Sequence, residues 1–385
     1  MNDSSFEINS KTYLKKKNLI SSKFIKKKKI LKFLIIRYRI NILFLFIIII
    51  ILFIILKKND TNYKIIGKKL ILSREIIKIY SSVFNESKNG FNKGPKILND
   101  YIPKKLDFKE KKGIGICCIG KNENLYAKEY VEYYFKLGIK KIIIYDNNDI
   151  NGEKFEDVLE EYIKNNYVEI INIRGFQSTQ IPIYNLCYKT YNKQFDYMSF
   201  LDFDEFIIIK KNLNINEYIY SSKLQKCETI LLNWVIYGDN ELEKYDNRTM
   251  MERFTKPIYK LSRGKNIVRT DIPNLIIVTS HVIGVNTNYF CDSNGKRLFP
   301  KNFYDFESPK YLEVYIKHFF TKTAEEFCMK LNRGDAHFYK EESNYLNIMN
   351  ERINSFMKFN KINNEKLNII ENCSGINLNK YRYKI

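Results

Sequence analysis

The stretch YMSFLDFDEFIII, residues 197–209, carries the strongest indication of architecture in this chain of 385 residues. A short apolar run leads into two aspartates, Asp202 and Asp204, which are separated by a single phenylalanine. Hydrophobic residues on both sides disfavour a solvated acidic loop, although helix-capping or surface acids remain the alternative. Side chains alternate along an extended segment, so we expect both carboxylates to point to the same side. Glu205 would then face away and orient the loop.

Upstream of this stretch, strand-like and helix-like segments alternate in short steps. Apolar runs predict four strands, at residues 114–119, 141–145, 167–173 and 197–201. Helical spacing predicts helices between them, at residues 125–137 (ended by Gly138), 155–162 and 180–191. This alternation predicts an α/β fold with a parallel sheet. Ligands bind beyond the carboxyl ends of such strands, so three loops are expected to line one cleft: 120–124, 146–149 and 202–205.

Downstream of residue 206 the pattern is less regular. Apolar runs predict further strands at residues 230–237, 275–280 and 311–317, and residues 323–332 have helical spacing. Residues 341–385 are polar and are expected to form a helical or irregular extension.

The net charge of +22 is unevenly distributed along the chain. Residues 1–58 hold fourteen Lys and Arg against Asp3 and Glu7, which is a net charge of +12. More than half of the excess therefore flanks one hydrophobic segment. A high positive charge often marks nucleic-acid binding, but this distribution points to a membrane instead, and no nucleic-acid partner is expected.

That hydrophobic segment, residues 40–56, contains only Asn41 as a polar residue. Its length is at the short end of what crosses a bilayer core, and a buried core helix is the alternative. The run ends in Lys57-Lys58 without a small-residue cleavage site, which favours an uncleaved signal-anchor. More basic residues precede the segment than follow it, so the N-terminus is predicted in the cytosol. We expect a cytoplasmic tail (1–39), a transmembrane signal-anchor (40–56) and a stem (57–112).

Seven cysteines are present without any CxxC spacing, so a structural zinc site is not expected. An odd number leaves at least one thiol free or paired between chains. Cys117 and Cys118 lie in an apolar run and are expected to be buried without a role of their own.

The aspartate pair suggests a metal site. Carboxylate oxygens at the end of a buried strand suit Mg²⁺ or Mn²⁺, with diphosphate oxygens completing the coordination. The metal would stabilise the negative charge that develops on a departing nucleoside diphosphate. His281 ends the predicted strand 275–280 and could be a third ligand, with His318 as a second candidate. A lone histidine in a strand is more often simply hydrogen-bonded.

Several motifs now follow one another in order: GKNEN at 120–124, EYVEYY at 129–134, Gly138, YDNN at 145–148 and DFDEF at 202–206. With them the chain resembles glycosyltransferase family 92 and related family 2-like enzymes of the GT-A fold. KNIVR at 265–269, His281, HFFTK at 318–322 and KLNRG at 330–334 also fit. The resemblance covers about residues 113–340, the predicted catalytic domain. Where relatives often carry Trp and His in the first helix, this chain has Tyr130 and Tyr134.

This resemblance implies a Rossmann-like GT-A nucleotide-sugar transferase fold and metal-dependent transfer from a nucleotide-sugar, commonly UDP-linked and often with inversion. Lys121, Asn122 and Glu123 would line the nucleotide pocket, with Asp146 near uracil or ribose. A loop that opens a helix offers free N–H groups, which agrees with this assignment; an exposed ion pair is the alternative for Lys121 and Glu123. Candidate diphosphate clamps are Arg269 and also Arg253, Lys265 and Arg333.

Inverting transfer requires a carboxylate that takes the proton of the acceptor hydroxyl. We favour Asp239 or Glu241, because they follow Trp234 and Tyr237, which could stack on an acceptor sugar. Core packing of Trp234 is an equally good explanation. Glu252 and Asp335 are further candidates for the base.

Taken together, the sequence predicts a single-pass type II membrane glycosyltransferase that uses Mn²⁺ or Mg²⁺. It would move a sugar from a nucleotide-sugar, UDP-linked in most relatives, to a glycan, glycoprotein or glycolipid acceptor, the less regular second half giving acceptor specificity. In a eukaryotic cell the catalytic domain would face the Golgi or ER lumen. The alternatives are a non-catalytic membrane-anchored carbohydrate-binding protein and another Rossmann-like nucleotide enzyme. The aspartate pair favours the transferase, since a binding module needs no metal site.

Overall fold

The computed structural model describes residues 110–375, with gaps at 177–178, 211–212, 273–274, 278, 282–288, 299–312 and 335–344, and in addition Glu75. These residues belong to one unit that extends from residue 72 to the C-terminus. The predicted tail, signal-anchor and nearly all of the stem lie outside the described residues. Within the described part, no helix has the length and apolar character needed to cross a membrane.

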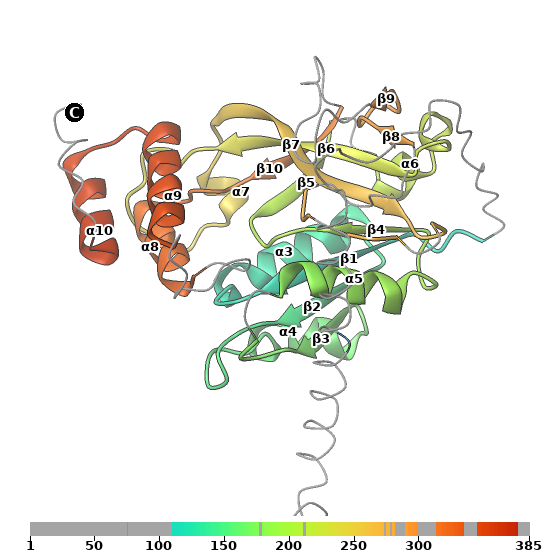
Figure 1. The fold of residues 1–385 in the computed structure, drawn as a ribbon, viewed down its shortest axis with the longest axis horizontal. Helices are drawn as coiled ribbons and strands as arrows, with labels where there is room; N and C mark the ends of the chain where they lie inside the picture. Colours follow the sequence, from blue (N-terminus) through green and yellow to red (C-terminus); the bar gives the residue numbers. More distant parts are fainter. Residues whose placement is uncertain are drawn as a thin grey trace, which may run out of the picture. The chain divides into compact units, whose positions relative to one another are not determined.

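The first half of the described chain alternates strands and helices (Figure 1). The elements are β1 (Ile114–Gly120), α3 (Asn124–Leu137), β2 (Lys141–Asp146), α4 (Glu156–Lys164), β3 (Val168–Asn172), α5 (Gln180–Tyr191) and β4 (Tyr197–Phe200). The strands lie in the order β3-β2-β1-β4 and every neighbouring pair is parallel. The predicted α/β alternation and parallel sheet are confirmed, with element ends shifted by no more than two residues.

Alternation of side chains along β1 builds an apolar core on each face of the sheet. Ile114 and Ile116 pack in the core that also contains residues of α3, whereas Cys117 and Ile119 pack in the core that contains residues of α5. Full burial of one such isoleucine stabilises the fold by about 1.5–3 kcal/mol. The chain continues from β1 in one direction through β2 and β3 and then crosses back to β4. This change of direction leaves a crevice at the carboxyl ends of β1 and β4.

The second half extends the same sheet in a mixed arrangement, continuing from β4 in the order β7-β6-β10-β5. The elements are β5 (Glu205–Ile209), α6 (Ile215–Ile219), a 3₁₀ turn (Ser222–Leu224), β6 (Thr229–Tyr237), α7 (Met250–Arg253), β7 (Pro257–Arg269), β8 (Phe290–Cys291), β9 (Arg297–Leu298) and β10 (Val314–His318). β7 is antiparallel to both β4 and β6, while β10 is parallel to β6 and antiparallel to β5.

Two strand predictions need correction in this half. Residues 257–269 form the long strand β7, which was not predicted, because its first half is exposed and its buried half contains Lys265. β7 also runs very close to β6: a Cβ at Gly264 would lie 1.8 Å from the carbonyl oxygen of Leu232, so only glycine fits there. Conversely, the described residues of the predicted strand 275–280 do not form a strand. Leu275 and Ile277 pack instead in the core beside α5.

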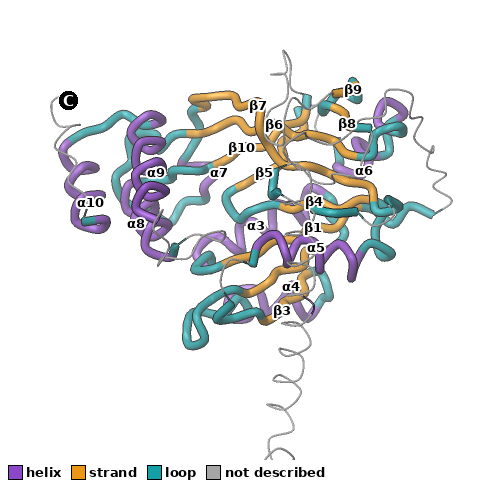
Figure 2. The backbone as a smooth tube through the Cα atoms, in the orientation of Figure 1, coloured by secondary structure: helices purple, strands orange, loops and turns teal. Residues whose placement is uncertain are grey.

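Three helices follow β10 and lie beside one another at one end of the sheet (Figures 1 and 2). They are α8 (Ala324–Arg333), α9 (Tyr345–Phe359) and α10 (Asn364–Ser374). α8 begins at a capping box in which Thr323 and Glu326 satisfy each other's backbone N–H groups. The helices share a small apolar core that includes Phe327, Phe356 and Leu367. Much of the predicted C-terminal extension is therefore helical and packs on the rest of the domain.

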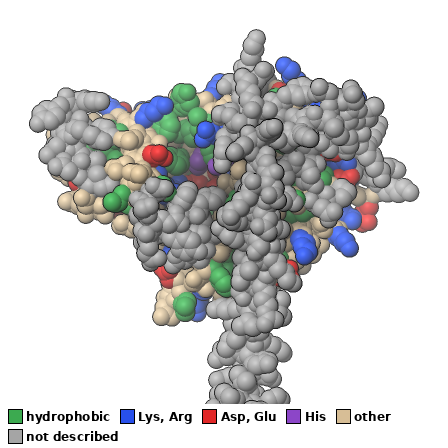
Figure 3. All heavy atoms as spheres, in the orientation of Figure 1, with side chains coloured by type: hydrophobic (Ala, Val, Ile, Leu, Met, Phe, Trp, Pro, Cys, Tyr) green, Lys and Arg blue, Asp and Glu red, His purple; other side chains and the backbone are tan. Residues whose placement is uncertain are grey.

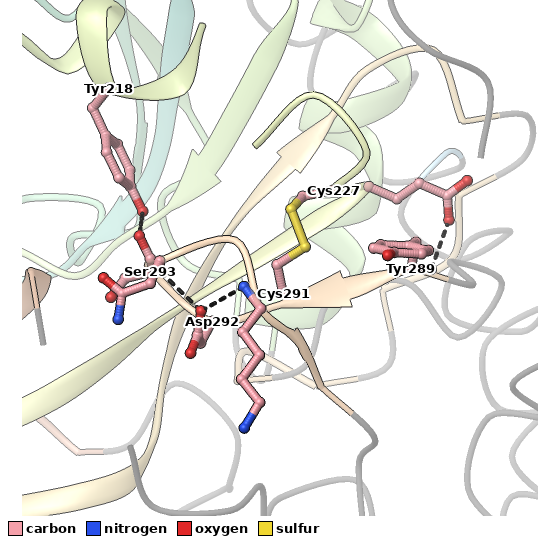
Figure 4. The surroundings of a disulfide bond; sticks show 9 residues. Tyr218, Cys227, Tyr289, Cys291, Asp292 and Ser293 are labelled. Carbon is pink, nitrogen blue, oxygen red and sulfur yellow. Dashed lines mark hydrogen bonds between the residues drawn. A yellow bond between two sulfur atoms is a disulfide. The ribbon is translucent and has the colours of Figure 1, made fainter. Parts of the chain in front are cut away.

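The described residues include three disulfide bonds, Cys117–Cys187, Cys227–Cys291 and Cys328–Cys373. Cys118 is buried and free, as expected. Cys117 is buried too, but its expected lack of a role was wrong because it joins β1 to α5. Around the second disulfide, the hydroxyl of Tyr218 donates to the carbonyl oxygen of Ser293 at 2.8 Å, which fixes the loop after β8 (Figure 4).

Candidate active site

A pocket of about 660 Å³ lies at the crevice between the carboxyl ends of β1 and β4. The residues lining it include Gly120, Lys121 and Glu123 after β1, Asp202 and Asp204 after β4, Trp234 on β6, Arg263 on β7, His318 on β10, Lys330 and Arg333 on α8 and Arg352 on α9. On the face shown in Figure 3, acidic, basic and histidine side chains meet in a hollow. Residues distant in sequence are thus brought together at one site.

The segment from Asp202 to Asp204 is a turn rather than the extended segment that we expected. Phe203 lies between the two aspartates in sequence. Its ring is buried, stacks on Phe155 at 5.3 Å and packs against Tyr130 at 4.8 Å. Both aspartates line the pocket. Their side chains differ in access, since that of Asp202 is 35% exposed and that of Asp204 only 4%. The buried ring therefore fixes the turn that presents both carboxylates to the pocket.

The carboxylate of Asp202 receives three donors. Lys265 donates to it from β7 at 2.9 Å, and Gln180 and Tyr184 of α5 donate at 3.2 Å. Burial opposes ionisation, but the charge of Lys265 outweighs it and lowers the pKa of Asp202. Lys265 is itself completely buried, so its ammonium is a fixed part of the site.

Asp204 is surrounded by positive charge. The ammonium of Lys330 donates to its carboxylate at 2.7 Å, the ammonium of Lys322 lies at 3.6 Å, and Nε2 of His318 lies 3.6 Å from its other oxygen. Burial is again outweighed, here chiefly by Lys330, and the pKa of Asp204 lies well below its ordinary value. Burial lowers the pKa of His318, even though Asp204 is close. Asp204 is therefore a carboxylate held firmly in its charged form.

Glu205 lies behind the pair and orients the turn, as expected. Its carboxylate accepts the backbone N–H of Asp202 at 2.9 Å. It is completely buried, and desolvation raises its pKa well above the ordinary value.

The loop after β1 places two of the predicted nucleotide residues at the pocket. Lys121 lines it and pairs with Asp149 at 2.7 Å, while Glu123 lines it and pairs with Arg333. Asn122 does not line the pocket; it has a φ of 53° and donates its backbone N–H to the side chain of Asn148 at 2.7 Å. Each residue is thus ion-paired, though not with the other, and each faces the pocket, while their contact with a nucleotide stays a prediction.

Asp146 and Arg269 do not lie where the sequence placed them. Asp146 is buried, binds the guanidinium of Arg174 at 2.6 Å and does not line the pocket, although the next residue, Asn147, does. Arg269 pairs with Asp271 at 2.5 Å and lies opposite Tyr197, at the start of β4. It is therefore at the far end of the sheet from the pocket, because β7 runs antiparallel to β4.

The proposed bases are also away from the pocket lining. Asp239 is buried against Lys366 at 2.6 Å, and Glu241 is exposed and pairs with Lys361 at 3.2 Å. Glu252 caps α7, and Asp335 lies outside the described residues. Among the described lining residues, the carboxylates are Glu123, Asp202 and Asp204.

The two candidate histidine ligands flank Trp234 at the pocket. Trp234 lies 4.9 Å from the ring of His281 and 4.5 Å from that of His318, and all three line the pocket. Within the described part of the chain, no group of three or more His, Cys, Asp or Glu residues is arranged to hold a metal. The predicted three-ligand set of Asp202, Asp204 and His281 is therefore not assembled. Trp234 is buried in the core and also reaches the pocket, while its stacking on an acceptor sugar stays a prediction.

The sequence named Arg333 of α8 as a candidate diphosphate clamp, but the role of Lys330 on the same helix was missed. Lys330 and Arg333 line the pocket from one helix and are three residues apart, so they lie on the same face. Phe327 and Leu331 bury the other face in the helical core. This amphipathic spacing was visible in the sequence, but nothing in it indicated that the basic face would meet Asp204. Of the other candidate clamps, Lys265 reaches Asp202, whereas Arg253 is buried against Glu326.

A comparison with protein families finds a match at residues 112–378 to the family described as Glycosyltransferase family 92. The chain belongs to glycosyltransferase family 92. The family 92 region begins just before β1 and extends beyond residue 340, so it includes α9 and α10 as well as the pocket.

Curated relatives support the family 92 assignment. A glycosyltransferase family 92 protein of Oryza sativa subsp. japonica is 23% identical over 172 residues, which are 43% of this chain and 29% of the rice protein. A family 92 protein of Ricinus communis is 22% identical over 170 residues, 43% of this chain and 30% of that protein. The matched stretch spans less than a third of the length of either relative.

Solved structures similar to the family 92 chain include S. aureus TarS in complex with UDP-GlcNAc, at 13% identity and a TM-score of 0.30, covering 68% of this chain and 80% of that one. Another is the mannosyltransferase PcManGT from Pyrobaculum calidifontis in complex with GDP-Man and Mn2+, at 9% identity and a TM-score of 0.24, covering 42% of this chain and 47% of that one. Similarity at this level decides neither substrate nor metal.

Proposed function

We propose that this family 92 chain is a metal-dependent glycosyltransferase of the GT-A type that uses a nucleotide-sugar, UDP-linked, as donor. One observation carries the proposal: Asp202 and Asp204 face a single pocket at the carboxyl ends of β1 and β4, beside the loop that opens α3. Nucleotides bind at this point of a parallel sheet. Membership of the family supports the reaction class.

The charges of the pocket suit an anionic donor. Its described lining contains five cations, Lys121, Arg263, Lys330, Arg333 and Arg352, and three carboxylates. The excess positive charge favours a diphosphate, and the guanidinium groups can bind its oxygens in bidentate fashion. The start of α3 adds backbone N–H groups at the same loop. The nucleotide would thus lie against β1 and its diphosphate toward α8.

The aspartate pair fits a divalent cation that is shared with the donor. Asp202 and Asp204 offer only hard oxygen ligands, and both are held as carboxylates by neighbouring cations. The pair lacks a third protein ligand among the described residues, so the remaining positions would be filled by donor oxygens and water. When bound, Mn²⁺ or Mg²⁺ would offset the negative charge on the departing diphosphate.

The acceptor would enter from the side of β7 and α9. Trp234, Leu261, Phe320 and Phe359 give this side of the pocket an apolar lining, and apolar and aromatic surfaces stack on sugar rings. We therefore propose a glycan, glycoprotein or glycolipid acceptor; transfer with inversion is proposed from the family resemblance alone. Asp239 and Glu241 are not retained as bases, because neither lines the pocket.

The disulfides favour an oxidising compartment. Three such bonds in one domain are typical of proteins in the secretory pathway or outside the cell. With the predicted signal-anchor at 40–56, we propose a single-pass type II membrane protein whose catalytic domain faces the lumen of the ER or Golgi in a eukaryotic cell. Asn247, in the exposed sequence Asn-Arg-Thr, tests this orientation. Glycosidase-sensitive modification there would support it, and chemical labelling of the same loop from the cytosol would refute it.

The reaction is tested with the full-length chain in detergent. We expect Mn²⁺-dependent hydrolysis of a UDP-sugar, and Asp204→Asn should lower kcat/KM by about 100-fold or more, because a carboxylate that would hold the metal is lost. Asp157→Asn, at an exposed position of α4, is the matched control and should leave kcat/KM unchanged. Equal turnover by Asp204→Asn and the unaltered chain would remove the proposal.

A further inference from the structure

An ammonium occupies the position at Asp204 where a metal would be expected. Nζ of Lys330 lies 2.7 Å from one carboxylate oxygen of Asp204 and also donates to the carbonyl oxygen of Phe320 at 3.2 Å. It lies 4.7 Å from the centre of the Phe320 ring. A divalent cation on the same oxygen would be repelled by this ammonium at short range. Metal and lysine therefore compete for one carboxylate.

Of the two lysines at Asp204, only Lys330 is placed to move. Its side chain is 14% exposed and lines the pocket, whereas that of Lys322 is 3% exposed and does not. Lys322 is further held by the ring of Tyr126 at 4.2 Å and by its own backbone, which has a φ of 53°. Lys322 thus remains as a permanent counter-charge if Lys330 leaves.

Once a donor binds, its diphosphate would offer Lys330 a second partner in the pocket. Arg333 lies three residues further along α8 and lines the same pocket, so the helix presents two cations to one anion. Four flexible bonds allow the lysine side chain to reorient without movement of the helix.

We propose that Lys330 is an exchangeable counter-ion: it holds Asp204 in the ligand-free protein and transfers to the diphosphate when a divalent cation takes its place. This inference rests on the proposed function. Metal and nucleotide then bind in a coupled manner, because the metal must displace the lysine and the displaced lysine improves the site for the diphosphate. The metal alone binds weakly as a result.

The first test measures binding, not turnover, with the full-length chain in detergent. Without nucleotide, Lys330→Met should bind Mn²⁺ about tenfold more tightly, since the competing charge is gone. With saturating Mn²⁺, the same variant should bind UDP about tenfold more weakly, because a charged contact is lost. Free Mn²⁺ is followed by electron paramagnetic resonance and UDP binding by calorimetry. Lys330→Met with unchanged or weaker Mn²⁺ affinity would overturn the proposal.

Matched variants separate the exchange from general electrostatics. Lys361→Met removes the same charge at an exposed site outside the pocket and should change neither affinity. Lys330→Arg keeps the charge and should restore weak binding of Mn²⁺ alone. Equal tightening of Mn²⁺ binding by Lys361→Met would mean that net charge, not the exchange at Asp204, controls the metal.

A second variant decides the matter even where Lys330→Met fails to fold. In the presence of a chelator, Asp204→Asn should bind UDP several-fold more tightly than the unaltered chain, because Lys330 is released. The double variant Asp204→Asn with Lys330→Gln should lose this gain, and its persistence would overturn the exchange. If the unaltered chain bound no UDP even with Mn²⁺, the proposed function would fail, while the Mn²⁺ measurements would still report on the exchange.

Discussion

The parallel strands β1–β4 and the helix α8 border the same pocket but bring opposite charges to it. The strand ends supply Glu123, Asp202 and Asp204, whereas α8 supplies Lys330 and Arg333. Asp202 and Asp204 come shortly after the buried strand β4, and Glu123 lies in the loop after β1. The cations lie on α8, which begins shortly after β10 and packs on α9 and α10. The acidic wall of the pocket (Glu123, Asp202 and Asp204) thus depends on the parallel strands, and the basic wall (Lys330 and Arg333) on the contacts of one helix.

Two of those contacts hold α8. Arg253 of α7 binds Glu326 with both guanidinium nitrogens, at 2.6 and 2.9 Å, and Cys328 is bonded to Cys373 of α10. Neither lies in the pocket lining, yet both determine where Lys330 and Arg333 can reach. The acidic wall should therefore tolerate changes elsewhere in the molecule, whereas the position of the basic wall should depend on a small number of contacts.

The largest expected effect follows from breaking the buried ion pair. Arg253→Met leaves the carboxylate of Glu326 buried without its counter-charge, where the two side chains are now only 1% and 0% exposed. The free energy of unfolding should fall by about 3–5 kcal/mol, measured by urea unfolding. Arg248→Met breaks an exposed pair with Asp246 and should leave the free energy of unfolding nearly unchanged. Similar losses in the two variants would show that α8 is not held by the buried pair.

Removal of the disulfide between α8 and α10 comes next. Replacement of both Cys328 and Cys373 by Ala should lower the free energy of unfolding by about 2–4 kcal/mol, because a closed loop is opened in the unfolded chain. Cys118→Ala, which removes only a buried free thiol, should cost about 1 kcal/mol. Thermal unfolding under non-reducing conditions measures both. If the double variant were as stable as Cys118→Ala, the disulfide would have no role in holding the basic wall.

The pH dependence of the same ion pair gives a smaller effect of known sign. Burial is outweighed by Arg253, so the pKa of Glu326 in the folded state is below the ordinary value of 4.5. The charged carboxylate therefore stabilises the fold above pH 4.5, and this contribution is lost as the pH falls through the folded-state pKa. Glu326→Gln should be less stable than the unaltered chain by about 1–3 kcal/mol at pH 7. Urea unfolding at pH 7, 5 and 4 should show the difference narrowing, and a widening would contradict the assignment.

The smallest effect concerns Lys121, a cation in the loop after β1 beside the acidic wall. Lys121 forms a partly exposed pair with Asp149, so Lys121→Met should change the free energy of unfolding by less than about 1 kcal/mol. If it contacts the nucleotide, UDP affinity in calorimetry should still fall several-fold. Lys164→Met breaks an exposed pair within α4 and should change neither quantity. Unaltered UDP affinity in Lys121→Met would show that Lys121 does not contact the nucleotide.

The two walls also differ in how far the sequence predicts them. Local patterns sufficed for β1 to β4 and for the aspartates after β4, since the alternation of Ile114 to Ile119 reports burial on two faces. Strand β2 was predicted correctly, but Asp146 at its end does not line the pocket as expected. Its carboxylate binds Arg174, a partner 28 residues away. Lys330 meets Asp204 across 126 residues. No local period carries that information, so this contact required the structure, although Arg333 was already a candidate clamp.

The packing of Phe203 links the two aspartates to Gly120, which also lines the pocket. A Cβ at Gly120 would come within 2.7 Å of the Phe203 ring and 2.5 Å of Phe155. Any larger residue at 120 requires the ring of Phe155 or that of Phe203 to move, which disturbs the packing behind the turn that carries both acids. A family member that kept Asp202 and Asp204 but replaced Gly120 should therefore have lower activity. Gly120 is therefore as useful as the two aspartates for separating active from inactive family members.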